Sequence, residues 1–105
     1  MSRQPTVTRW GSTNPPSHDH LDAVFGDEDL APSWWSSGPG DTYATHSHPY
    51  HKVLYCARGS IQFTIELSSE RIELTPGDRL DIPPGTVHSA IVGPNGVECI
   101  EAAKP

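Results

Sequence analysis

Basic residues and sulfur-containing residues are scarce in this chain of 105 residues. It has seven Lys or Arg against thirteen Asp or Glu, one methionine and two cysteines, and its formal net charge is -6. An acidic chain with few cations repels phosphate backbones and offers no basic surface to DNA or RNA. Nucleic acid is therefore not an expected partner.

Long hydrophobic runs are also missing. No apolar stretch approaches the roughly eighteen residues that a membrane-spanning helix needs. The first residues, Met1 to Pro5, lack the apolar segment that follows the charged start of a secretory signal. These two absences predict a cytoplasmic protein with no membrane partner.

The two cysteines, Cys56 and Cys99, are too far apart for a CxxC redox or zinc motif. Each falls in an apolar stretch, which favours a buried thiol that packs as a small hydrophobic side chain. A disulfide between them remains an alternative, although a cytoplasmic location disfavours it.

Proline and glycine, by contrast, are abundant. Eleven prolines and nine glycines mostly separate short apolar runs, a pattern typical of many short strands rather than long helices. With 34% hydrophobic residues, the chain has room for one modest core. We therefore expect a single all-β domain.

The expected strands follow from the alternation of apolar and polar residues. In the strand expected at 52–58, Leu54 and Cys56 share a face with Lys52, while Val53, Tyr55 and Ala57 share the other face. Strands are predicted at 52–58, 61–67, 71–74, 79–82, 87–92 and 97–102, with turns at Gly59-Ser60, Ser68-Ser69 and 93–96.

The first third of the chain is less regular. A short edge strand is expected at 6–10, and one helix at 19–25, capped by Ser17 or Asp19 and ended by Gly26. This segment would wrap the outside of the domain or cover one end of it. Trp34 and Trp35 follow, and because neighbours on a strand face opposite ways, one indole should enter the interior.

The densest run of histidine is His46-Ser47-His48, in a stretch expected to be a strand. Two residues separated by one project from the same face of a strand, so both imidazoles would point the same way. A third histidine, His88, follows the corner Pro83-Pro84-Gly85, where proline cannot continue a sheet ladder.

The spacing of these groups resembles a known family. Gly40, five residues, His46-Ser47-His48, ten residues and Gly59 form one motif. Gly77, five residues, Pro83-Pro84-Gly85, two residues and His88 form a second. Together they are similar to the two-part motif of the cupins. The resemblance implies a double-stranded β-helix, or jelly-roll, barrel at 34–105 with an N-terminal extension at 1–33.

The resemblance also implies a metal site made of His46, His48 and His88. Neutral imidazoles suit a divalent transition metal, and Fe, Zn, Ni, Cu and Mn all stay open. The other histidines are not expected to be ligands: His51 points away from the face of Lys52, and His18 and His20 lie in a region rich in turn formers.

Two positions depart from the family pattern: Lys52 stands where cupins usually carry a glutamate ligand, and Val92 where asparagine is common. Lys52 can form a salt link to Glu66 or Glu98, hold a substrate carboxylate, act as a base with a pKa lowered by burial, or reach solvent at the rim. We expect Lys52 and Gln62 to contact substrate.

Two functions compete. The first is a small metal-dependent enzyme, with dioxygenase chemistry on a small anionic or chelating molecule. The second is a binding module that holds such a molecule and catalyses no reaction. A sugar isomerase is disfavoured because no basic phosphate-binding cluster is present. The apolar set Val53, Tyr55 and Ala57 predicts a homodimer.

Overall fold

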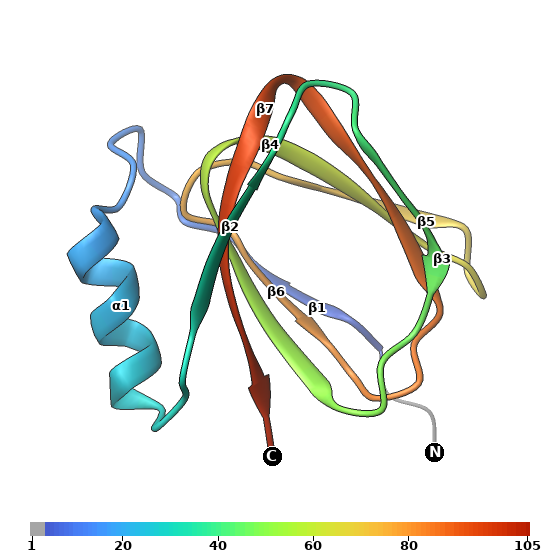
Figure 1. Cartoon of the computed structure of the whole chain (residues 1–105), viewed down its shortest axis with the longest axis horizontal. Helices are drawn as coiled ribbons and strands as arrows, with labels where there is room; N and C mark the ends of the chain where they lie inside the picture. The colour runs from blue at the N-terminus through green and yellow to red at the C-terminus, as the bar shows by residue number, and fades with distance from the viewer. Residues whose placement is uncertain (1–3) are drawn as a thin grey trace.

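An antiparallel sheet curled into a barrel makes up most of the protein (Figure 1). The computed structural model describes residues 4–105. Its elements in chain order are β1 (Thr6–Thr8), α1 (His18–Asp27), β2 (Ser33–Ser37), β3 (Thr42–His46), β4 (His51–Ile65), β5 (Glu70–Leu74), β6 (Arg79–Ile82) and β7 (His88–Lys104). The predicted all-β jelly-roll barrel with one short helix is confirmed.

The two longest strands, β4 and β7, hold the barrel together. They pair from His51 opposite Lys104 to Ile65 opposite His88. On this frame the sheet runs in the order β1-β6-β4-β7-β2, while β3 pairs with β7 and β5 pairs with β4. The start of β7, which carries His88, therefore lies beside the end of β3, which carries His46.

The predicted turns at Gly59-Ser60 and at 93–96 are wrong. The chain does not reverse at either place: β4 and β7 both continue, and a shift of register between Gly59 and Ile61 marks a bend. Gly59 has a φ of 72°, and a Cβ there would lie 1.9 Å from the carbonyl oxygen of Gly96. Glycine is needed at this bend because the two backbones approach too closely for any side chain.

The other predicted turns agree with the structure. The Ser68-Ser69 turn leads into β5, and β6 spans the predicted residues. The corner at Pro83-Pro84-Gly85 closes with a hydrogen bond from the Thr86 amide to the Pro83 carbonyl. This corner sets the direction in which His88 enters the barrel.

Two apolar clusters lie on the two faces of β4. Leu54 and Cys56 belong to the cluster inside the barrel, whereas Val53 and Ala57 belong to a cluster outside it. The predicted alternation is confirmed. Cys56 and Cys99 are opposite each other in register, fully buried and both free, so the thiols pack as small core residues.

Helix α1 covers the outer cluster, lying outside the barrel (Figure 1). The Ser17 side chain caps it by accepting a hydrogen bond from the His20 amide. Its buried residues Leu21 and Phe25 pack on the face that carries Val53 and Ala57. Part of the apolar face that predicts a homodimer is therefore covered by the chain's own helix.

The N-terminal segment wraps the barrel from outside. Strand β1 extends the sheet by pairing with β6, from Thr6 opposite Asp81 to Thr8 opposite Arg79. The division at residue 33 between an extension and the barrel stays a prediction. Within residues 4–105, no helix is long and apolar enough to cross a membrane.

Candidate metal centre

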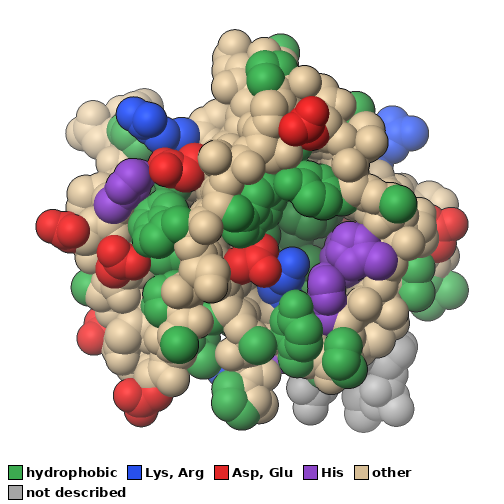
Figure 2. All heavy atoms as spheres, in the orientation of Figure 1, with side chains coloured by type: hydrophobic (Ala, Val, Ile, Leu, Met, Phe, Trp, Pro, Cys, Tyr) green, Lys and Arg blue, Asp and Glu red, His purple; other side chains and the backbone are tan. Residues whose placement is uncertain are grey.

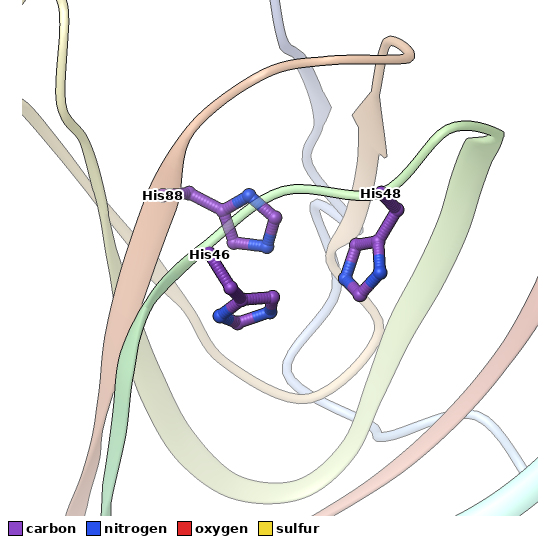
Figure 3. A group of neighbouring side chains, drawn as sticks. All are labelled: His46, His48 and His88. Atoms are coloured by element: carbon purple, nitrogen blue, oxygen red, sulfur yellow. The ribbon is translucent and has the colours of Figure 1, made fainter.

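Three imidazole rings meet at one wall of the barrel interior (Figure 3). His46 ends β3, His48 lies in the loop between β3 and β4, and His88 begins β7. One nitrogen from each ring lies within 4.8 Å of the others. His48 is not on a strand as predicted, but its ring turns toward the other two.

The backbone orients two of the rings. The Nδ1 of His46 lies 2.6 Å from the Ala44 carbonyl oxygen, and the Nδ1 of His88 lies 2.8 Å from the Thr86 carbonyl oxygen. A carbonyl oxygen only accepts hydrogen bonds, so each Nδ1 carries the proton and each Nε2 keeps a free lone pair. This arrangement, a backbone acceptor behind each imidazole, is common among metal-ligating histidines.

The Nε2 atoms of His48 and His88 are buried and have no hydrogen-bond partner within residues 4–105. Such an atom costs free energy unless something binds it. Burial, followed by the nearby charge of Lys52 and of His46, lowers the pKa of His48. Burial also lowers the pKa of His88, against the opposing effect of the Thr86 carbonyl. Both shifts favour the neutral form of the ring, which metal binding requires.

These features fit a divalent transition-metal ion held by His46, His48 and His88. Three neutral nitrogen donors suit zinc, iron, nickel or copper better than calcium or magnesium, which prefer oxygen. When bound, such an ion acts as a Lewis acid and lowers the pKa of a hydroxyl that coordinates it.

A pocket of about 370 Å³ opens beside the histidines. His46 and His88 contribute to its wall, and Leu54, Ile61 and Phe63 make it apolar. Figure 2 shows a hollow in this face, with acidic and basic side chains next to purple histidine side chains. A larger hollow of about 650 Å³ near Leu67 and Pro84 has no titratable side chain among the described residues that line it.

Lys52 points into this pocket and forms an ion pair there. Its Nζ lies 3.2 Å from Oε2 of Glu101, and only 12% of its side chain is exposed. The indole Nε1 of Trp35 donates to the other carboxylate oxygen, Oε1, at 2.7 Å. The partner of Lys52 is thus Glu101 rather than the predicted Glu66 or Glu98, and the rim position in solvent is excluded.

Glu101 is the site residue that sequence reasoning missed. It lies on β7 opposite Leu54, and it shares the inner face with Cys99. Because side chains alternate along a strand, Glu101 shares a face with Cys99 and could have been placed inside the barrel. The residues on the other face of β7 are apolar too, so the sequence alone does not show which face is the inner one. Glu98, one of the two partners predicted for Lys52, points outward and accepts a hydrogen bond from His18 at 2.8 Å.

Gln62, predicted to contact substrate, is not brought to the histidines. Its neighbours Ile61 and Phe63 line the pocket, so alternation turns Gln62 to the outer face of β4. His51 also points away and contacts Asp81 at 2.8 Å. Trp35 is the indole that enters the barrel, while Trp34 packs on the outer cluster and donates to Asp22.

Comparison with known proteins identifies the family. The family model for the cupin domain matches residues 33–97, which is more than half of the chain. The chain therefore belongs to the cupin family. It is also 45% identical over 56 residues to quercetin 2,3-dioxygenase of Bacillus subtilis (strain 168). That match covers 51% of this chain and 16% of the relative, so the chain spans a small part of the relative's length.

Solved structures share the fold. An RmlC-like cupin from Shewanella frigidimarina aligns with a TM-score of 0.63 and 25% identity, over 72% of this chain and 66% of its own. The DMSP lyase DddQ from Ruegeria pomeroyi aligns with a TM-score of 0.66 and 22% identity, over 72% and 38%. The polyketide cyclase RemF from Streptomyces resistomycificus aligns with a TM-score of 0.65 and 21% identity, over 70% and 53%.

Proposed function

We propose that this cupin binds a divalent transition metal through His46, His48 and His88 and uses it to oxidise a small chelating molecule with dioxygen. The observation that carries the proposal is the pair of buried, unpartnered Nε2 atoms on His48 and His88, which lie close to a nitrogen of His46. Nothing in the described chain satisfies these atoms, whereas a metal ion would.

The pocket favours a small and largely flat ligand. Trp35, Tyr43 and Phe63 give it aromatic walls, and the volume of about 370 Å³ suits a molecule of one to three rings. Lys52 is neutralised by Glu101, so the charge of the metal would govern which ligands bind. Hydroxyketones, catechols and flavonols, which offer two adjacent oxygens, meet both conditions.

Similarity to quercetin 2,3-dioxygenase supports oxygenase chemistry over simple binding. The matched stretch is 45% identical, yet it is a small part of that relative. We carry over the class of reaction, dioxygenation of a chelating ring compound, and not the substrate. The cytoplasmic location and the homodimer remain predictions.

Oxygen uptake tests the proposal. Metal-free protein is loaded separately with iron, nickel, copper, manganese and zinc, and oxygen consumption is followed with a panel of flavonols, catechols and hydroxyketones. We expect uptake with at least one redox-active metal, none with zinc, and none after His46→Ala. His20→Ala, which removes an exposed histidine of α1, should behave like the wild type.

Two other outcomes are informative. A ligand that raises the melting temperature of the metal-loaded protein without oxygen uptake would favour the non-catalytic binding module. Absence of both metal retention and ligand binding would contradict the proposal.

A further inference from the structure

Among the groups that line the metal pocket, Glu101 lies outside the two-part motif, which ends at His88. We propose that Glu101 is the proton acceptor of this site: it takes the proton from the ligand hydroxyl held beside the three histidines, and Lys52 then pairs with the ligand oxyanion. This inference rests on the proposed function and names the ligand class more closely. The ligand is neutral in solution and carries an ionisable hydroxyl next to a second oxygen.

The position of Glu101 supports this role. Its carboxylate lies in the same pocket as His46 and His88, and its side chain is 23% exposed. It reaches the pocket from β7, whereas Lys52, on the neighbouring strand β4, stands where the family usually carries glutamate. The chain thus places a carboxylate in the pocket from a different strand and puts a cation beside it.

The chemistry of the lining leaves few bases. Among the described residues that line the pocket, the Lys52 ammonium and the Trp35 indole can only donate hydrogen bonds. The hydroxyls of Ser36 and Tyr43 are weaker proton acceptors than a carboxylate. The free lone pairs of His46 and His88 would be taken up by the metal ion of the proposed function. Glu101 is therefore the base that remains.

The contacts of Glu101 fix its position and leave it room to accept a proton. The Trp35 indole donates a hydrogen bond to Oε1, and the Lys52 ammonium forms an ion pair with Oε2. A carboxylate has about four acceptor sites, so each oxygen keeps one free. The hydrogen bond at one oxygen and the ion pair at the other hold the group in one orientation, as a positioned base requires.

The transfer balances in protons and in charge. The ligand O–H bond breaks and an O–H bond forms on Glu101; the electron pair of the broken bond stays on the ligand oxygen. Glu101 becomes neutral, so the Lys52 ammonium loses its carboxylate partner and attracts the new oxyanion instead. The charge of the pocket does not change, and no proton is released to the solvent.

Counting released protons tests this inference. Maltol, a hydroxyketone with one ionisable hydroxyl, is titrated into the zinc-loaded protein near neutral pH in two buffers of different ionisation enthalpy. Calorimetry then gives the number of protons passed to the buffer, and the ultraviolet spectrum shows whether the bound maltol is ionised. Zinc excludes any redox step.

We expect the wild type to bind ionised maltol while releasing almost no proton, and Glu101→Gln to release about one proton per maltol bound. Glu98→Gln is the matched control, because Glu98 lies on the same strand but contacts His18 outside the barrel. It should match the wild type. The double variant Glu101→Gln/Lys52→Met removes both charges of the pair, and it should also release about one proton if the single variant does not fold.

Equal proton release from the wild type and the Glu101 variants, with maltol bound and ionised in both, would overturn the role of Glu101 and leave the proposed function standing. Failure of the wild type to hold zinc or to bind maltol would overturn the proposed function, and this inference with it.

Discussion

Asp78 ties the N-terminal segment to the barrel through a single buried carboxylate. It accepts hydrogen bonds from the Arg9 guanidinium at 2.9 Å, the Trp10 amide at 3.0 Å and the Thr75 amide at 3.0 Å. Burial alone would raise its pKa. The hydrogen bonds from the amides of Thr75 and Trp10 and from the Arg9 side chain outweigh burial and hold the pKa of Asp78 below its usual value.

This depressed pKa makes a prediction about stability and pH. A carboxyl with a lower pKa in the folded state stabilises the fold above its unfolded pKa, and that stabilisation is lost as the pH falls through the folded pKa. We expect Asp78→Asn to lower the free energy of unfolding by about 2 kcal/mol at pH 7 and by much less near pH 3. Urea denaturation at both pH values measures this. An equal loss at both would contradict the role of the charge.

The residues of the site were predictable to different degrees. His46, His48 and His88 follow from the spacing of two short motifs, because each motif is local in sequence. The pairing of Lys52 with Glu101 depends on the register between β4 and β7, which is a long-range property. Gln62 is a different case: alternation puts it on the opposite face of β4 from Ile61 and Phe63, so this geometry gives no support to its predicted contact with substrate.

At the scale of elements, the bend of β4 is a feature that depends on one residue. Gly59 combines a left-handed backbone conformation with a close approach to the Gly96 carbonyl. We expect Gly59→Ala to lower the free energy of unfolding by about 3 kcal/mol, because alanine disfavours this φ and its Cβ would clash with backbone. Thermal or urea denaturation measures the loss.

Gly26, in helix α1, is the matched control. A Cβ there would meet none of the described atoms within 4 Å. Gly26→Ala should raise the free energy of unfolding by about 0.5–1 kcal/mol, since alanine favours a helix. If Gly59→Ala changed the free energy of unfolding as little as Gly26→Ala does, the claim that close packing at the bend requires glycine would be contradicted.

The elements also show where sequence patterns lose information. Strand positions followed from alternation, because it persists along β4 and β7. The connection at Gly59-Ser60 did not, since a glycine–serine pair suits both a hairpin and a bulge within one strand. The distinction depends on whether the neighbouring strand continues alongside, and here β7 does.

At the scale of the whole molecule, the barrel brings two distant motifs together. Pairing of β3 with β7 sets His46 opposite His88, and the Gly85 amide donates to the His48 carbonyl at 2.8 Å. This hydrogen bond joins the loop of the first motif to the corner of the second. The histidine cluster is thus a product of the fold as a whole, and the cupin resemblance predicts it.

The outside of the molecule was harder to predict. The apolar set on the outer face of β4 indicated a subunit interface, but α1 covers part of it: Phe25 is fully buried and packs edge-on against Tyr55 at 5.6 Å. From sequence alone, an apolar face does not reveal whether it meets another copy or a segment of its own chain. The homodimer is therefore a prediction that now lacks part of its original surface.

The central claim is that the three histidines bind a metal, and the most direct test is zinc titration of metal-free protein with a competing chelator. We expect the wild type to bind about one zinc ion per chain, His20→Ala to do the same, and His46→Ala to bind at least roughly 100-fold more weakly. Binding of no zinc by the wild type, or equal affinity in His46→Ala, would contradict the account.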